Sequence, residues 1–313
     1  MVLNPVRARA IAAASLGAIA MVACSSGGSS PSATSTKTVV IGSAPFSESI
    51  IVANMYAGAL QEEGFQVTVR KGLGQREIYL PALQKGGADN GIDLVPEYVG
   101  TLLEFVNKNA MEASGNLDDS VAKLRTRLDT IGLTALNPSP AADQNAFAVT
   151  RATADKLKLK KLSDLTPAVA ATLTLGAGPE CPSRPFCLPG LEKTYGLKFK
   201  TFRVLDSGGA KTMQALTAGD IDVGLVFSSD GAVAARDLIV LEDDKKLQTV
   251  DNIIPAIRKD IVTDKIRTIL NRVSAAMTTE ELIGLNKQAD VDKADPEVLA
   301  KGWLQQHGIT KKK

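Results

Sequence analysis

Two stretches of this 313-residue sequence place aromatic and polar side chains directly after a short apolar run. Residues 92–95 precede the Pro-Glu-Tyr triplet at 96–98, and residues 223–226 precede the Phe-Ser-Ser-Asp cluster at 227–230. Ligands of open α/β sheets sit at the carboxyl ends of strands and against helix N-termini. Both clusters are therefore candidate binding positions for a small molecule.

Each cluster ends a similar unit, in which a helix is followed by a glycine, an Ile-Asp pair and an apolar strand. The first unit covers residues 72–101, and the second begins at Met213. Two such units in one chain predict two similar lobes that face one ligand. The alternative is that A-L-x-x-G followed by I-D is a common helix-to-strand turn.

The start of the chain's folded part predicts a further element at the same site. Residues 38–43 form a β-branched run that ends at Gly-Ser, which is typical of a buried strand. After Phe46, Ser47 is a natural N-cap for an amphipathic helix, and Glu48 lies in the first turn, where the helix dipole favours a carboxylate. This loop either faces a ligand or only caps the helix.

The order of strands and helices up to about residue 105 predicts a parallel, helix-covered sheet, and the whole chain predicts an α/β fold of two lobes. A proline-rich break over residues 138–145 predicts the first crossing between lobes, and we expect the return crossing near residues 231–238. The first lobe then comprises residues 38–142 and 233–313, and the second lobe residues 143–232. The C-terminal helices would return to cover the first lobe, leaving the pocket between the lobes.

Composition and motifs exclude several classes of function. Lysine and arginine total 36 against 34 aspartates and glutamates, so the basic excess of a nucleic-acid binder is missing. The sequence has no G-x-S-x-G, no phosphate-binding G-x-x-x-x-G-K-[ST] and no zinc spacing. Its one histidine, His307, is expected to be an exposed helix-end residue. We therefore expect that the protein is not an enzyme and that it binds neither a cofactor nor a metal.

The N-terminus has the features of an export signal. Arg7 and Arg9 precede an apolar segment, residues 10–22, which is shorter than the ~20 residues of a spanning helix. Small residues before Cys24 resemble a lipobox, so we expect a signal peptide over residues 1–23, acylation of Cys24 and a flexible tether over 24–37. The protein would then be exported and held on the outer face of the cell membrane by its lipid alone. The alternative is an ordinary secretory peptide with an incidental cysteine.

The two other cysteines, Cys181 and Cys187, flank a short loop rich in glycine and proline. An exported protein permits a disulfide between them, and so short a bridge would be structural.

Six segments together resemble one known family, the glycine betaine/choline/osmoprotectant-binding proteins of ABC importers. They are TVVIGSAPFSESIIVANMYAGALQEEG, GLGQREIYLPALQKG, GIDLVPEYVGTLLEF, NAFAVT, QALTAGDIDVGLVFSSDG and VLEDDKKLQTVDNIIPAIR. The resemblance implies a periplasmic-binding-protein fold of the class with two crossing strands. It also implies capture of a compatible solute such as glycine betaine, choline or carnitine, and its delivery to a permease and ATPase, by a protein that we expect to be a monomer.

Members of that family hold a quaternary ammonium group in a cage of aromatic rings, because a methylated cation donates no hydrogen bonds and is attracted to π faces. The family motif often reads D-x-Y-P-E-Y, whereas this chain has Val95 at the first tyrosine. The rings left for a cage are Phe46, Tyr79, Tyr98 and Phe227. Tyr56 lies on a helix face that is equally consistent with the core. A sparser cage leaves open a polyol, an aromatic polyol or an amino-acid-like ligand, or a tethered sensor with the same fold.

Polar candidates complete the expected site. Arg76, which with Gln75 opens the helix after Gly74, would suit bidentate contact with an anion; the alternative is a solvated charge. Amides and hydroxyls at the start of a helix expected after Phe227 would suit a carboxylate or hydroxyl group, although plain capping explains them equally well. The polar candidates that would line the cleft are Ser47, Glu48, Gln75, Arg76, Asn145, Ser228, Ser229 and Asp230.

Overall fold

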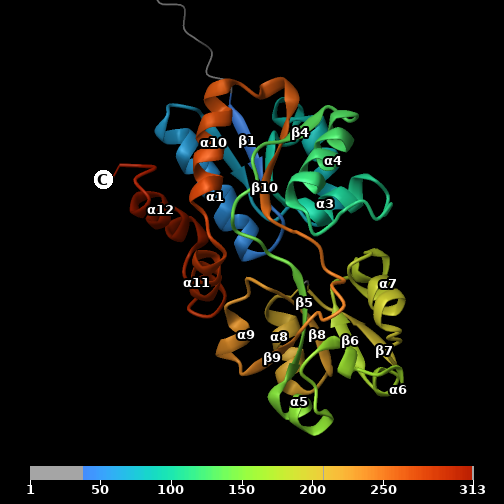
Figure 1. The fold of residues 1–313 in the computed structure, drawn as a ribbon. Helices are drawn as coiled ribbons and strands as arrows, with labels where there is room; N and C mark the ends of the chain where they lie inside the picture. Colours follow the sequence, from blue (N-terminus) through green and yellow to red (C-terminus); the bar gives the residue numbers. More distant parts are fainter. Residues whose placement is uncertain (1–37, 207, 312–313) are drawn as a thin grey trace, which may run out of the picture. The chain divides into compact units, whose positions relative to one another are not determined.

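The computed structural model describes residues 38–206 and 208–311, which contain two five-stranded sheets (Figure 1). The expected signal peptide, Cys24 and the tether lie outside these residues. Among the residues described, no helix has the length and apolar character needed to cross a membrane.

The first sheet has the strand order β2-β1-β3-β10-β4. Its strands are β1 (Val39–Gly42), β2 (Val67–Arg70), β3 (Leu94–Tyr98), β4 (Leu133–Ala135) and β10 (Ile253–Arg258). Strands β2, β1 and β3 are parallel, and β10 runs antiparallel to both β3 and β4. Every residue of β3 is buried, as expected for a strand covered by helices on both faces.

Helices cover both faces of the first sheet, and with it they form the first lobe. They are α1 (Ser47–Glu62), α2 (Arg76–Lys85), α3 (Val99–Val106), α4 (Leu117–Asp129), α10 (Asp264–Ala276), α11 (Thr279–Asp290) and α12 (Pro296–Gln306). Side chains alternate along β3, so Leu94 packs with α1 and the C-terminal helices whereas Val95 packs with α2, α3 and α4. The C-terminal helices thus cover the first lobe. His307, which caps α12, is partly buried, because its ring lies 4.2 Å from that of Trp303 and its Nε2 lies 2.7 Å from Glu281.

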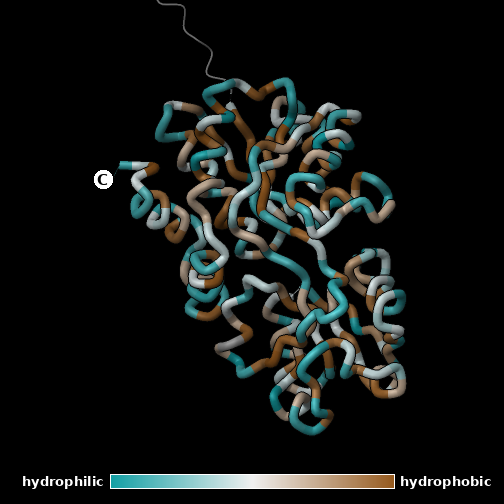
Figure 2. The backbone as a smooth tube through the Cα atoms, in the orientation of Figure 1, coloured by the Kyte–Doolittle hydropathy of each residue, from teal (hydrophilic) through white to brown (hydrophobic). Residues whose placement is uncertain are grey.

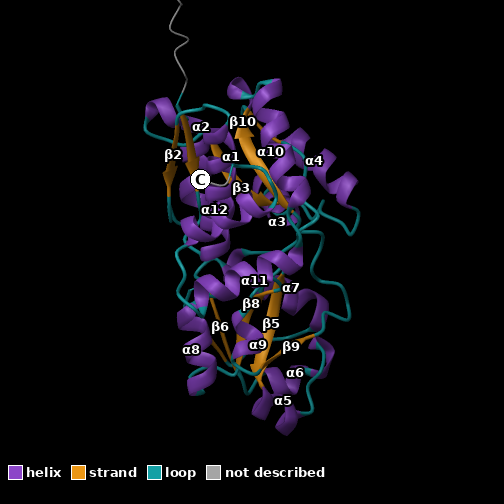
Figure 3. Cartoon of the chain, turned by 90° about the vertical axis from the view of Figure 1, so that its left-hand side faces the viewer, coloured by secondary structure: helices purple, strands orange, loops and turns teal. Residues whose placement is uncertain are grey.

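The second sheet repeats the arrangement of the first, with the order β7-β6-β8-β5-β9. Its strands are β5 (Asn145–Thr150), β6 (Thr174–Ala177), β7 (Thr201–Val204), β8 (Val223–Phe227) and β9 (Leu238–Leu241). Strands β7, β6 and β8 are parallel, and β5 runs antiparallel to β8 and β9. The second lobe adds the short helices α5 (Arg151–Leu157), α6 (Pro167–Ala170), α7 (Leu188–Gly190), α8 (Ala210–Ala218) and α9 (Ala232–Ala235). Strands of each sheet lie between helices in Figure 3, and apolar segments concentrate along them in Figure 2.

The predicted position of the return crossing, near residues 231–238, is wrong. Strand β9 pairs with β5 of the second sheet, so the second lobe continues beyond residue 241. The apolar run of β9 covers a backbone edge of β5 that would otherwise stay unpaired, and no local signal in the sequence indicates that partner. The chain returns later, beside the first crossing: Ala142 pairs with Asn252, and the Asp143 amide donates to the Asp251 carbonyl at 3.0 Å.

Tight packing of α3 against the return crossing gives a test of this arrangement. A Cβ on Gly100 would lie 2.5 Å from the Val250 carbonyl oxygen, which is backbone and cannot move aside. Gly100→Ala should lower the free energy of unfolding by about 1–3 kcal/mol. The control is Gly302→Ala at an exposed position of helix α12, where a Cβ meets nothing within 4 Å, and this change should raise the free energy of unfolding by up to ~1 kcal/mol. Urea unfolding measures both; effects of the same sign would contradict the packing.

Candidate functional site

A cavity of about 90 Å³ lies between the two sheets, at the carboxyl ends of β3 and β8. Its wall combines the start of α2, the two crossing segments and the loop between Cys181 and Cys187, which are joined by a disulfide. The candidates from the sequence that line it are Phe46, Gln75, Arg76, Tyr79, Tyr98, Asn145 and Phe227. One residue of each strand-end cluster, Tyr98 and Phe227, thus lies at this cavity.

Aromatic rings from both lobes converge at the cavity. The Phe46 ring lies 6.3 Å from the Tyr98 ring within the first lobe, and 5.9 Å from the stacked Phe227 ring of the second lobe. Tyr79 lines the same cavity. Tyr56 is instead a core residue, fully buried, with its hydroxyl 3.0 Å from that of Ser274. The structure therefore brings the four expected rings together.

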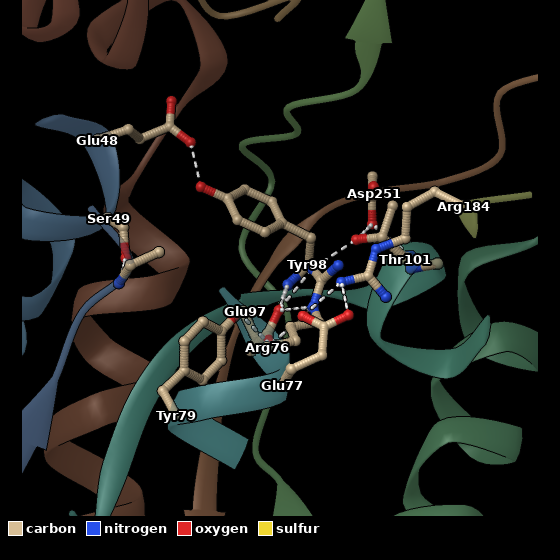
Figure 4. A network of polar contacts seen from close by, with 12 residues as sticks. Glu48, Ser49, Arg76, Glu77, Tyr79, Glu97, Tyr98, Thr101, Arg184 and Asp251 are labelled. Atoms are coloured by element: carbon tan, nitrogen blue, oxygen red, sulfur yellow. Dashed lines mark hydrogen bonds and ion pairs between the residues drawn. The ribbon is translucent and has the colours of Figure 1, made fainter. Parts of the chain in front are cut away.

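The Arg76 guanidinium is held by a carboxylate of this chain (Figure 4). Its Nε and Nη2 donate to Glu97 at 2.9 and 2.8 Å, and Nη2 also donates to the Thr101 hydroxyl at 2.7 Å. The Tyr79 hydroxyl donates to the same carboxylate at 2.8 Å. Glu97 is fully buried, so this network satisfies its charge and fixes the Tyr79 ring. The bidentate contact predicted for Arg76 is thus made inside the protein.

A second arginine, which is not among the residues expected from the sequence, reaches the cavity from the disulfide loop. Arg184 Nη2 donates to the Glu77 carboxylate at 3.0 and 3.1 Å, and its guanidinium lies 4.8 Å from the centre of the Phe105 ring. Burial, together with the nearby positive charge of Arg76, lowers the pKa of Arg184. This positive charge is only partly solvated, which favours an added anion. The position of Arg184 between two cysteines is the one feature of the sequence that could have singled this residue out.

Two further carboxylates in the cavity wall come from the crossing segments, and the sequence analysis missed both. Asp143 accepts the Ser229 amide at 2.9 Å, and Asp251 accepts the amides of Gly100 and Thr101 at 2.9 and 3.0 Å. Burial raises the pKa of Asp251 to about 7 and that of Asp143 well above its ordinary value. Their neighbours in the sequence, such as Gln144 and Thr249, are polar as well, so no local signal singles these two acids out.

Several polar candidates lie away from the cavity. Phe46, not Ser47, is the N-cap of α1, and the Ser47 hydroxyl donates to Asp290 at 2.5 Å. No helix starts directly after Phe227, because α9 begins only at Ala232; Ser228 is exposed and its hydroxyl accepts the Gln144 amide.

The other polar candidates are buried or half-buried, and three of them, Glu48, Ser229 and Asp230, lie beside a second hollow. Asp230 lines a neighbouring hollow of about 410 Å³, where burial raises its pKa to about 6. Glu48 and Ser229 are buried and bonded to each other at 2.6 Å. Asn145, which does line the cavity, donates its amide to the Phe186 carbonyl at 3.3 Å.

Comparison with known proteins decides the family. The family model described as the substrate binding domain of ABC-type glycine betaine transport systems matches residues 37–306. The chain belongs to this family. A glycine betaine-binding protein of Escherichia coli K12 is 27% identical over 87% of this chain and 92% of its own length. A carnitine transport binding protein of Listeria monocytogenes is 26% identical over 87% and 88%.

Solved structures agree with this assignment. A crystal structure titled as a glycine betaine/carnitine/choline ABC transporter is 27% identical, covers 87% of this chain and 99% of its own, and superposes with a TM-score of 0.68. The ligand-free form of the Escherichia coli protein has a TM-score of 0.61 at 26% identity, over 87% of this chain and 99% of its own. The fold is that of the type II periplasmic binding proteins, and the protein is a substrate-binding component of an ABC transport system.

The raised pKa of Asp251 predicts a pH-dependent stability. An unfolded aspartate titrates near 3.9. Between about pH 4 and pH 7 the folded chain therefore binds this proton more tightly than the unfolded chain does. The stability that the carboxyl contributes is present below pH 4 and is lost as the pH rises to about 7.

Asp251→Asn keeps an acceptor for the Gly100 amide but does not titrate in this range. As the pH rises from 4 to 7, the wild type should lose up to ~4 kcal/mol of unfolding free energy relative to the variant. Urea unfolding at a series of pH values measures this difference, and one that stays constant with pH would contradict the raised pKa.

Proposed function

We propose that this protein captures a zwitterionic solute with a methylated ammonium group, of the glycine betaine and carnitine class, in the cavity between its lobes. The observation that carries the proposal is the convergence of Phe46, Tyr98 and Phe227, because π faces from both lobes attract a cation that has no N–H groups. The names of the two relatives support the same class of solute.

The anionic end of the solute has a partner on the second lobe. Arg184 lines the cavity, carries an incompletely solvated charge and has planar donors that suit a carboxylate. Arg76 is less available, because Glu97 and Thr101 already hold its guanidinium. Rings and Arg184 together would orient a solute that has its cationic and anionic groups at opposite ends.

The sequence and the family support a proposal for where the protein acts and which partners it has. We infer an exported monomer anchored by a lipid on Cys24, which closes around its solute and delivers it to a permease driven by an ATPase. The charged n-region, the short apolar segment and the small residues before Cys24 support export, and the family supports the transport partners.

Replacing one ring tests the aromatic wall. Phe227→Leu keeps an apolar side chain but removes the π face, and it should weaken glycine betaine binding about 3- to 30-fold in isothermal titration calorimetry. Phe202→Leu is the matched control, since this ring lies on edge strand β7 and does not line the cavity. If glycine betaine, carnitine and choline all fail to bind the wild type while a polyol binds, the proposed solute class is wrong.

The role of Arg184 predicts a difference between solutes. Arg184→Gln should weaken glycine betaine, which carries a carboxylate, by about 10- to 100-fold, and should leave choline, which has none, nearly unchanged. Glu77→Gln is the control, because it removes the ion pair of Arg184 but keeps its charge. Equal losses for the two solutes would assign Arg184 to closure of the cavity instead of to solute recognition.

A further inference from the structure

Glu48 lies outside the cavity, yet three distant elements donate hydrogen bonds to its carboxylate. Tyr98 at the end of β3 donates its hydroxyl to Oε1 at 2.7 Å (Figure 4). Oε2 accepts the Ser229 hydroxyl, just beyond β8, at 2.6 Å, and the Asn286 amide of α11 at 2.7 Å. Glu48 itself lies in the first turn of α1 and is 3% exposed. One buried group thus joins both lobes.

The charge of Glu48 is met by neutral donors and by the dipole of its own helix. Among the described residues, no lysine or arginine forms an ion pair with it. Hydrogen bonds to an ionised acceptor in a dry setting are among the stronger ones in proteins, and a missing donor is costly there. The Ser229 hydroxyl therefore matters more to Glu48 than a surface hydrogen bond would.

Packing around Ser229 independently brings the second lobe close to α11. A Cβ on Gly231 would lie 2.5 Å from the Ile283 carbonyl oxygen of α11, so only glycine permits this approach. The Ser229 carbonyl accepts the Asn286 amide at 3.1 Å, and its own amide donates to Asp143 on the first crossing. The segment after β8 is therefore held at the point where the lobes meet.

We propose that Glu48 is a positioning residue that fastens the closed lobes together: its carboxylate fixes the Tyr98 ring from within the first lobe and takes the Ser229 hydroxyl only when the second lobe is closed. The coupling to solute binding rests on the proposed function, whereas the preference for the closed form does not. The Tyr98 ring in the cavity wall and the Ser229 hydroxyl of the second lobe both donate to Glu48. Closure of the lobes and placement of the Tyr98 ring therefore occur together.

Ser229→Ala removes the donor from the second lobe and leaves Tyr98 bonded to Glu48. In the solute-free protein the closed-to-open ratio should fall about tenfold, and the Kd for glycine betaine should rise by a similar factor. The ratio is measured by double electron–electron resonance between spin labels on exposed Thr130 of the first lobe and Lys156 of the second, with Cys24 replaced by Ser throughout.

Ser163→Ala is the matched control, because the Ser163 hydroxyl donates to Asp244 at the same 2.6 Å but inside the second lobe. It should change neither the distance distribution nor the Kd. Glu48→Leu removes the shared acceptor, so it should lower the closed-to-open ratio as Ser229→Ala does, and it should raise the Kd further because Tyr98 also loses its partner. The double variant should open no further than Glu48→Leu alone.

Three outcomes overturn the proposal: an unchanged distance distribution in Ser229→Ala, an equal shift in Ser163→Ala, or additive effects of the Glu48 and Ser229 changes. If the wild type binds none of the methylated solutes while the distances behave as expected, the proposed function fails and the role of Glu48 stands. If the solutes bind but the distances between the spin labels do not change in Ser229→Ala, the proposed function stands and the role of Glu48 fails.

Discussion

Both tyrosines of the site, Arg76 and the start of α3 depend on the need to satisfy carboxylates that are buried where the two lobes meet. Glu48, Glu97, Asp143 and Asp251 are each less than 6% exposed, and a buried carboxylate without donors is strongly destabilising. The donors they recruit are the features that build the cavity: the hydroxyls of Tyr79 and Tyr98, the guanidinium of Arg76 and the first amides of α3. The positions of the Tyr79 and Tyr98 rings thus follow from the hydrogen bonds that their hydroxyls donate to the buried carboxylates Glu97 and Glu48.

The same constraint limits how much unsatisfied negative charge lies around the cavity. Glu97 is paired with Arg76, and Asp251 accepts three hydrogen bonds from the start of α3. Donors inside the protein therefore satisfy Glu97, which lies behind the wall, and Asp251, which lines it. The rest of the wall includes the aromatic rings and the guanidinium of Arg184. Phe46 is central, because it touches a ring of each lobe. A phenylalanine there offers a π face and no competing hydroxyl.

Local signals in the sequence predicted the elements well and their partners less well. The repeated helix–glycine–strand unit predicted two similar lobes, because strand and helix periodicity are local properties, and the comparisons confirm the fold. Strand β9 was assigned to the wrong lobe because its pairing with β5 is a choice between distant edges. Arg76 was expected to face a ligand, yet Glu97 takes its guanidinium, and a strand-end acid gives no sign of that contact. Arg184 and Asp251 enter the wall only through the tertiary fold.

The disulfide joins Cys181 and Cys187, which are only six positions apart in the sequence, and Arg184 lies within the loop that it closes. A chain segment confined in this way has few conformations to lose when a solute arrives. The guanidinium of Arg184 is therefore carried by a segment with little conformational freedom, so keeping it at the cavity wall costs little free energy. Without this bond the loop would have more conformations to lose, so holding Arg184 at the cavity wall would cost more conformational entropy.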